Sequence, residues 1–261
     1  MERWRWLSRE VESPAVIVNT TGFTLEVIEA QKPVLTMKII VGRPYTRTPL
    51  FHTNITAIEL NPAWHIPTSI VTKELSPLIR RDPQYLAKHH ISVVRGWSDA
   101  ASINPTNINW ARLSPRSFPY RLRQEPGPWN ALGRIKFHLP SPFSIYLHDT
   151  PAQSLFTRAV RVFSHGCIRI EKPLDLASYL LRDTSWTRDA LQTAIEQYTR
   201  ITIRLTRPVP VYIGYWTAWV EENGTVHFRP DLYGRDRRLS STTRLDLQDN
   251  SDRQHQNRRC S

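Results

Sequence analysis

Two short stretches of this sequence decide how the chain is interpreted. Residues 145–151 read IYLHDTP, and residues 164–169 read SHGCIR, with fifteen residues between His148 and Ser164. Cys167 ends the run Ser-His-Gly-Cys. A thiolate is a strong nucleophile, but a free cysteine with a pKa near about 8.5 is mostly protonated at neutral pH. A histidine within hydrogen-bond reach can remove that proton and later return it to a leaving amine.

The glycine before the cysteine supplies the third part of such a site. Because Gly166 has no side chain, backbone N–H groups beside it can close on a developing oxyanion. Two other interpretations are open. His148, His165 and Cys167 could bind zinc, although His-x-Cys is not a usual ligand spacing and no Cys-x-x-Cys completes a set. Alternatively, Cys167 is a buried structural cysteine with two incidental histidines nearby.

The segments around this pair are mostly typical of β-strands. Apolar residues alternate with polar ones over 23–27 and 35–41, on either side of a turn at 31–33, which predicts a hairpin with one buried face. Two helices with one apolar face each are expected after the cysteine, over 172–181 and 187–198. Further strands are expected at residues 16–18, 55–60, 134–139, 144–148, 201–205 and 211–220.

A region of different composition interrupts the strands between about residues 75 and 128. It begins with helix signals over 75–81 and 84–90 and continues into a segment rich in proline and asparagine. It holds eight basic and three acidic residues. We expect a cap or lid over about 75–128 rather than an independent domain. The last segment, 235–261, is polar without apolar periodicity, and we expect it to have no fixed structure.

Composition excludes several classes of protein. The 261 residues are 40% hydrophobic and 22% charged, which is typical of a globular chain and not of a disordered one. No run approaches the roughly 20 apolar residues of a transmembrane helix. Cys167 and Cys260, the two cysteines, cannot make a disulfide framework. The net charge of +12 would suit nucleic-acid binding, but no zinc-finger, KH, RNP or P-loop pattern accompanies it.

The pattern around the histidine and the cysteine resembles the signature of the YkuD-type L,D-transpeptidase catalytic domain. Five further segments resemble the branch of that family with a large capping insertion, often called YcbB-like. They are MERWRWL at 1–7, LEV at 25–27, IVGRPY at 40–45, NPAWHIP at 61–67 and HDTP at 148–151. The resemblance covers about residues 1–235. It implies a mostly β fold of the α+β class, a β-sandwich or open barrel with a helical-loop cap and C-terminal helices, as one catalytic domain over 1–234.

The resemblance also implies a reaction. Cys167 would attack a tetrapeptide stem of peptidoglycan, release D-alanine and pass the acyl group to the side-chain amine of a diamino acid, which yields a 3→3 cross-link. A carbapenem would acylate the same thiol and leave Cys260 unmodified. A cysteine L,D-carboxypeptidase that hydrolyses stems and a non-catalytic wall-binding module are the alternatives. Papain-like peptidases place cysteine before histidine, which is the reverse of this order.

Roles for individual residues follow from the same resemblance. His148 would be the general base, oriented by the backbone carbonyl of Asp149, and His165 would support the site. Gly166 and Cys167 would donate backbone N–H groups to an oxyanion hole. The residues expected to bind substrate are Arg169, Tyr146, Trp64 and Ser164.

Expectations for cofactors, partners and location complete the interpretation. No cofactor and no metal are expected. The expected partners are peptidoglycan stem peptides, together with other wall-synthesis proteins, and neither nucleic acid nor a membrane segment is expected. The resemblance implies a protein of the periplasm or cell envelope. Because Met1 falls inside the segment resembling the family and no signal peptide precedes it, we expect a truncated or fragmentary chain.

Overall fold

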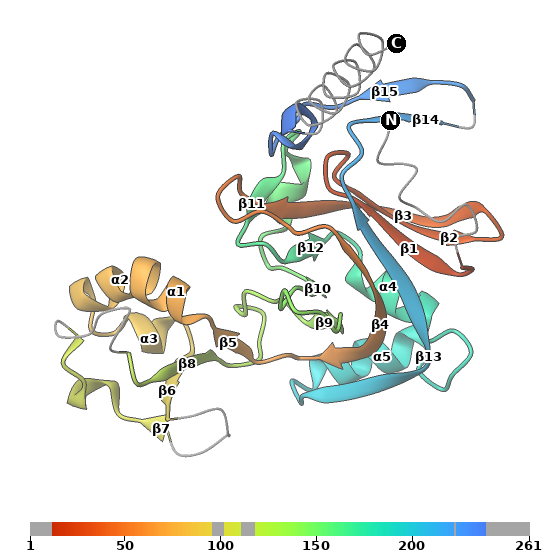
Figure 1. Ribbon diagram of the computed structural model, residues 1–261. Coiled ribbons are helices and arrows are strands. Elements are labelled where there is room, and N and C mark those ends of the chain that lie inside the picture. Colours follow the sequence, from red (N-terminus) through yellow and green to blue (C-terminus); the bar gives the residue numbers. More distant parts are fainter. Residues whose placement is uncertain (1–11, 96–101, 111–117, 222, 239–261) are drawn as a thin grey trace, which may run out of the picture.

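A nine-stranded sheet and a four-stranded sheet form the framework of the chain (Figure 1). The computed structural model describes residues 12–95, 102–110, 118–221 and 223–238. The expected tail beyond residue 238, which includes Cys260, lies outside these residues.

The large sheet has the strand order β11-β3-β12-β10-β9-β4-β13-β1-β2. Because β2 also pairs with β3, this order closes on itself and forms a barrel. Its strands are β1 (Ala15–Asn19), β2 (Thr24–Glu29), β3 (Lys32–Gly42), β4 (Phe51–Leu60), β9 (Ile135–His138), β10 (Leu147–His148), β11 (Val162–Ser164), β12 (Ile168–Ile170) and β13 (Ile201–Gly214). The predicted hairpin is β2–β3, and the predicted mostly β fold is confirmed.

The interior of the sheet is filled by apolar side chains that recur at every second strand position. On β2, Leu25 and Val27 are fully buried, whereas the residues between and beside them are only partly buried. Leu147 on β10 and Ile168 on β12 join the same core. Burying one such side chain contributes about 1.5–3 kcal/mol. The pattern therefore fixes which face of each strand points inward, and with it the face that carries the polar residues.

Two helices after the cysteine cover part of this core, as predicted. Helix α4 (Pro173–Leu180) has proline in its first turn, and α5 (Arg188–Glu196) is capped by Thr187, whose hydroxyl accepts from the Ala190 N–H at 3.2 Å. The residues that these helices bury against the sheet are Leu176, Ala177, Leu191, Ala194 and Ile195. None of the helices in the described part of the chain is long and apolar enough to cross a membrane.

The cap is a separate layer beside the barrel (Figure 1). Its sheet has the order β5-β8-β6-β7, so it begins at Trp64, before the expected limit of 75. Its elements are β5 (Trp64–Ile66), α1 (Thr68–Ile70), the π-helix η2 (Val71–Leu75), α2 (Ser76–Arg81), α3 (Tyr85–Lys88), β6 (Ile91–Val94), β7 (Ser102–Ile103), η3 (Pro105–Asn107) and β8 (Arg121–Gln124). Ile70, Val71, Leu86 and Leu122 belong to a hydrophobic cluster of its own. The cap therefore has its own small core, which its loop-rich sequence did not predict.

Two expectations near the C-terminal end are corrected. The apolar run 211–220 is not one strand, because β13 ends at Gly214 and the chain turns there into β14 (Ala218–Val220), which pairs with β15 (Val226–Phe228). The Trp216 ring packs where a Cβ at Gly214 would stand, 2.0 Å away. The fold also continues past residue 234, since the Asp231 carboxylate accepts backbone N–H groups of residues 235–237.

Candidate active site

Two parallel neighbouring strands bring the predicted histidine and cysteine together. β10 ends at His148, and β12 begins directly after Cys167. In the register of this pair Leu147 lies opposite Ile168, and His148 lies opposite Arg169. Because Leu147 and Ile168 point into the core, their neighbours point to the other face. The residues that share this outward face are Tyr146, His148, Cys167 and Arg169.

The His148 ring is held by the backbone. Its Nδ1 lies 2.5 Å from the carbonyl oxygen of Asp149, which is the contact expected from the sequence. The side chain is only 4% exposed. Burial, reinforced by the nearby charge of Arg169, lowers the pKa of His148 to about 3, against the opposing hydrogen bonds to the carbonyls of Asp149 and Leu132. The imidazole is therefore neutral at neutral pH and can accept a proton.

Asp149 is itself fixed by a tight turn. Its carboxylate accepts the backbone N–H of Arg134 at 2.8 Å and that of Thr150 at 2.7 Å. Burial raises its pKa, which these two backbone hydrogen bonds oppose. Gly133 has a φ of +63°, and a Cβ there would lie 2.3 Å from the Asp149 Cγ. The sequence analysis did not identify Gly133. Its position directly before the strand expected at 134–139 is the one feature of the sequence that could have indicated a turn there.

The nucleophile loop, residues 164–167, is shaped by hydroxyl groups beneath it. Ser164 Oγ donates to the Cys167 carbonyl at 2.6 Å and accepts the Gly166 N–H at 3.1 Å. Thr48 Oγ1 donates to the Gly166 carbonyl at 2.8 Å and accepts the Gly42 N–H at 3.0 Å. Gly166 has a φ of +119°, which favours glycine. Thr48 belongs to no motif that the sequence analysis singled out, so its role went unpredicted.

Two residues predicted at the site use their polar groups within this loop. Ser164 is 2% exposed and its hydroxyl is used within the loop, and its expected contact with substrate stays a prediction. The N–H of Gly166 is already bonded to Ser164 and is not free for an oxyanion. By contrast, the structure gives the Cys167 N–H no hydrogen-bond acceptor among the described residues.

The Cys167 thiol is surrounded by the chain segment that precedes His148. Its Sγ lies 3.9 Å from the carbonyl oxygen of Ser144, and the Tyr146 hydroxyl forms a hydrogen bond with it. Burial raises the pKa of the thiol above its ordinary value, although Tyr146 opposes this. In the described part of the chain no hydrogen bond joins the thiol to the His148 ring. The free protein therefore holds a neutral thiol beside a neutral imidazole.

The aromatic residues expected at the site lie there. The Trp64 side chain, from the cap, forms a hydrogen bond with Tyr146, so the cap reaches the residue that contacts the thiol. The Tyr146 ring packs edge-on to the His148 ring with a centroid distance of 5.6 Å. Lys136 Nζ lies 4.6 Å from the centroid of the Tyr146 ring. These contacts enclose the side chain of Tyr146 between the cap and the barrel.

Arg169 and His165 are the remaining two residues that the sequence predicted at the site. Arg169 is close enough to Cys167 and Arg43 for their charges to interact, and burial is the main cause of the lowered pKa of Arg169. Its Nε is buried and has no partner among the described residues. His165 points toward the cap, where its Nε2 lies 2.6 Å from Glu74 Oε1 on η2. His165 is thus bound to the cap through Glu74.

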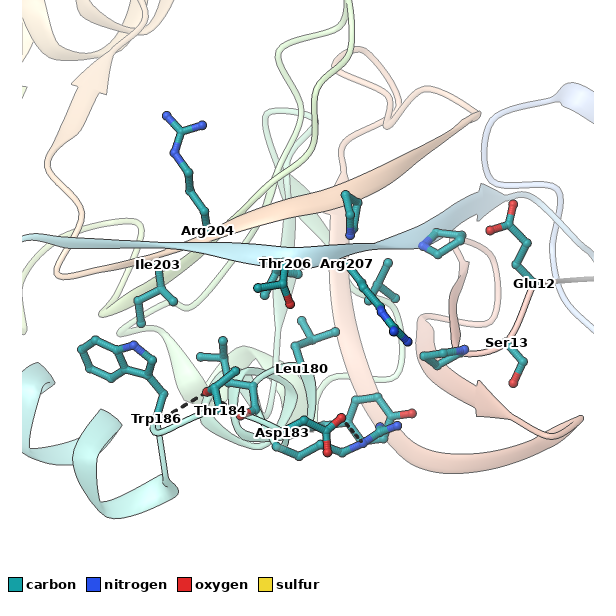
Figure 2. Close-up of a pocket in the computed structure, with 18 residues that line it drawn as sticks. Glu12, Ser13, Leu180, Asp183, Thr184, Trp186, Ile203, Arg204, Thr206 and Arg207 are labelled. Carbon is teal, nitrogen blue, oxygen red and sulfur yellow. Dashed lines mark hydrogen bonds and ion pairs between the residues drawn. The ribbon is translucent and has the colours of Figure 1, made fainter.

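Two cavities differ in their relation to this site. A cavity of about 430 Å³ lies between β13 and the segment that joins α4 to α5, and none of the predicted site residues lines it (Figure 2). Another, of about 460 Å³, is lined by Ser144 and Tyr146, which both contact the thiol. The cavity related to the site is therefore the second one.

The match to a known family agrees with this arrangement. Residues 13–213 match YkuD, the L,D-transpeptidase catalytic domain. The chain belongs to this family. It is 35% identical over 225 residues to a candidate L,D-transpeptidase of Haemophilus influenzae, an alignment that covers 86% of this chain and 45% of that protein. The chain thus spans less than half the length of this relative. The family predicted from the sequence is confirmed.

Solved structures of L,D-transpeptidases show a more distant likeness. The enzyme from Mycobacterium smegmatis is 12% identical, with a TM-score of 0.36 over 77% of this chain and 58% of that one. The catalytic domain of an E. faecium L,D-transpeptidase acylated by ertapenem is also 12% identical, with a TM-score of 0.34 over 78% of this chain and 99% of that one. At these scores the likeness adds nothing to the family assignment.

Proposed function

We propose that this chain is the catalytic part of a peptidoglycan L,D-transpeptidase that forms 3→3 cross-links. The observation that carries the proposal is the pairing of β10 with β12, which puts Cys167 and His148 on one outward face. The carbonyl of Asp149 lies against Nδ1 of His148, which favours the tautomer that carries its proton on Nδ1 and accepts one at Nε2. These are the parts that thiol-based acyl transfer requires.

The first half-reaction would release D-alanine. The Cys167 sulfur attacks the carbonyl carbon of the diamino acid in a tetrapeptide stem, and the thiol proton passes to Nε2 of His148. Because the thiol pKa is raised and the imidazole pKa is lowered, proton transfer accompanies the attack rather than preceding it. The C–N bond to D-alanine then breaks, and the imidazolium returns the proton to the leaving amine. The carbonyl of Asp149 stabilises the transient imidazolium.

The second half-reaction would transfer the acyl group. The side-chain amine of a second stem attacks the thioester, His148 takes a proton from that amine, and the C–S bond breaks. The proton then passes from the imidazolium to the departing sulfur. In both steps we assign the oxyanion to the free N–H of Cys167, and we assign Arg169 to a carboxylate of the substrate.

The proposed reaction places the protein where its substrate lies, in the periplasm or cell envelope. Turnover of a disaccharide-tetrapeptide by the purified chain tests it. We expect a cross-linked dimer and one D-alanine released for each cross-link, and neither product with Cys167→Ala. Release of D-alanine without dimer would instead identify an L,D-carboxypeptidase. Absence of both products with the folded protein would contradict the proposal.

A carbapenem provides a second test that does not depend on the acceptor. Mass spectrometry should show one adduct per chain, on Cys167 and not on Cys260. An adduct on Cys260, or no adduct, would mean that the site is not assembled as proposed.

A further inference from the structure

Residues 42–48, called here the support turn, hold the nucleophile loop on the barrel side. The Thr48 hydroxyl donates to the Gly166 carbonyl at 2.8 Å. The Arg43 N–H donates to the Ser164 carbonyl at 3.0 Å. The support turn thus bonds to two carbonyls of the loop, so the shape of the loop depends on the position of the turn.

The bond from Thr48 acts on the peptide group that joins Gly166 to Cys167. The carbonyl of this group accepts the Thr48 hydroxyl, and its N–H is the group assigned above to the oxyanion. A trans peptide group is planar, so its carbonyl and its N–H point in opposite directions. The bond to the carbonyl therefore sets the direction of the N–H. It also polarises the peptide group, which makes the N–H a stronger donor.

Two side chains from the C-terminal part of the chain hold Thr48. Tyr233 is only 3% exposed, and its hydroxyl donates to the Gly42 carbonyl at 2.6 Å. The same oxygen is within hydrogen-bonding reach of the Thr48 N–H, which opposes the rise that burial gives to the pKa of Tyr233. Arg235 Nη2 donates to the Thr48 carbonyl at 3.2 Å. The backbone of Thr48 is therefore held on both its N–H and its carbonyl side.

Tyr233 is itself fixed by its neighbours. The Tyr215 hydroxyl donates to Asp231 Oδ1 at 2.6 Å and accepts the Tyr233 N–H at 2.8 Å. The rings of Tyr215 and Tyr233 are stacked, with a centroid distance of 5.5 Å. These residues lie beyond residue 213, where the match to the YkuD domain ends. The family assignment therefore gives them no role.

We propose that Tyr233 is a positioning residue for acyl transfer, which holds Thr48 so that the Cys167 N–H is aimed at the oxyanion. This inference rests on the proposed function, because the reaction proposed there puts the oxyanion at this N–H. The contacts run from Tyr233 to Thr48, to the Gly166 carbonyl and so to the Cys167 N–H. Each step is a hydrogen bond or a planar peptide group, so a displacement of Tyr233 changes the direction of the N–H.

Two reactions of the Cys167 thiol separate an effect on the oxyanion from an effect on the thiol itself. Acylation by 4-nitrophenyl acetate forms a thioester through a tetrahedral oxyanion and releases 4-nitrophenolate, whereas alkylation by iodoacetamide displaces iodide without an oxyanion. Cys167→Ala gives the background rate of both. We expect Tyr233→Phe to slow acylation about tenfold, since a misdirected donor loses part of the roughly 10²–10³-fold contribution of an oxyanion-hole group. Alkylation should stay within about twofold at every pH, with an unchanged thiol pKa.

Variants of Thr48 test whether Tyr233 acts through it. Thr48→Val removes the hydroxyl and should slow acylation about thirtyfold, whereas Thr48→Ser keeps it and should recover most of the rate. The double variant Tyr233→Phe, Thr48→Val should be no more than about twofold slower than Thr48→Val alone, because groups that act in series are not additive. The control is Thr217→Val. It removes a hydroxyl that donates to Asp236 Oδ2 at 2.6 Å, within the C-terminal part of the chain, and should leave both reactions within about twofold.

An acylation rate in Tyr233→Phe within about twofold of the native rate would overturn the proposal. So would equal losses of acylation and alkylation, which indicate a displaced thiol, and so would multiplied losses in the double variant. A native chain that reacts with the ester no faster than Cys167→Ala would do the same. Because 4-nitrophenyl acetate contains no part of peptidoglycan, absence of stem-peptide turnover would contradict the proposed function and leave this result standing.

Discussion

The nucleophile loop is held in different ways on its two sides. On the barrel side, the buried hydroxyls of Ser164 and Thr48 bond to the loop backbone. On the cap side, His165 contacts Glu74 through side chains that are 31% and 47% exposed. A buried polar group left without its partner costs about 1–3 kcal/mol, whereas an exposed ion pair contributes about 0–1 kcal/mol. The barrel therefore fixes the shape of the loop, and the cap adds contacts that break at little cost.

Substitution of His148 on the barrel side and of His165 on the cap side tests this comparison most directly. We expect His148→Ala to lower the rate of Cys167 acylation by about a thousandfold or more, because the base is lost. His165→Ala should lower it by less than about tenfold, since that ring faces the cap. Acylation by a carbapenem, followed by mass spectrometry, measures both. A larger loss at His165 would reverse the assignment of the base.

Removal of the cap tests the comparison on a larger scale. Ile66 and Leu122 are cross-strand partners on β5 and β8, so a two-residue Asn-Gly turn can replace residues 67–121. Both partners would be changed to threonine, because the cap core that buries them is gone. We expect turnover of the stem peptide to fall about a hundredfold, because the part of the cap between these two strands no longer helps to position the substrate. Acylation of Cys167 by a carbapenem, followed by mass spectrometry, should persist. Loss of that reactivity would show that the barrel alone does not hold the loop.

A glycine pair measures the rigidity of the barrel side. Gly133→Ala should cost about 3 kcal/mol of unfolding free energy, about 1 for the left-handed backbone and the rest for the clash with Asp149. Gly224→Ala is the control, because its φ is +83° and nothing lies within 4 Å of the added Cβ. It should cost only about 1 kcal/mol. Denaturant titration compares them, and only Gly133→Ala should also slow acylation. Equal costs would mean that the turn at Asp149 is able to relax.

The pH dependence of stability tests the contribution of Glu59, a buried carboxylate that contacts His138, Lys136 and Arg200. Burial alone would raise the pKa of Glu59, but His138, Lys136 and Arg200 outweigh it and lower the pKa to about 2. The folded state therefore favours the ionised carboxylate, and its stabilising contribution is present above pH 4.5 and is lost as the pH falls through about 2. Glu59→Gln should lower Tm at pH 7, and the difference from the native chain should shrink between pH 4.5 and 2. A constant difference would argue against a charge effect.

The smallest effect is expected on the cap side of the loop. Glu74→Gln removes the charge opposite His165 and keeps the side-chain length. We expect a change of less than about 0.5 kcal/mol in stability and less than about threefold in turnover. Thr48→Val, a change on the barrel side, provides the contrast, with a cost of about 1–3 kcal/mol. If Glu74→Gln were the more damaging of the two, the cap would be part of the rigid framework.

Sequence patterns predicted the parts of the barrel that depend on local periodicity. The alternation along 23–27 and 35–41 and the apolar faces of α4 and α5 each follow from nearest neighbours in the chain. They did not predict the cap core, because its buried residues are spread over short strands and turns with no sustained period. The end of β13 at Gly214 was missed for a similar reason. An apolar run does not show that a tryptophan ring will occupy the place of a missing side chain.

The candidate site was likewise predicted only in part from the sequence. The motif around Cys167 and His148 pointed to two residues that the structure brings to one face, and to the carbonyl of Asp149 as the partner of the ring. Thr48 supports the loop at Gly166, and Gly133 supports the turn at Asp149. Both residues come from distant segments and act through tertiary contacts that no spacing in the sequence encodes. The sequence also did not show that the Gly166 N–H donates to the nearby Ser164 hydroxyl, and its role at an oxyanion stays a prediction.

Strand β3 has a consequence for how the protein unfolds. Its first half pairs with β2 and closes the ring, and its second half pairs with β12 and β11 beside the nucleophile. Just beyond it, the Arg43 N–H donates to the Ser164 carbonyl at 3.0 Å. The same strand thus joins ring closure to the shape of the reactive loop. Amides of residues 39–42 should be among the last to exchange with deuterium, and the thiol should lose its distinct reactivity in the same cooperative step that opens the barrel.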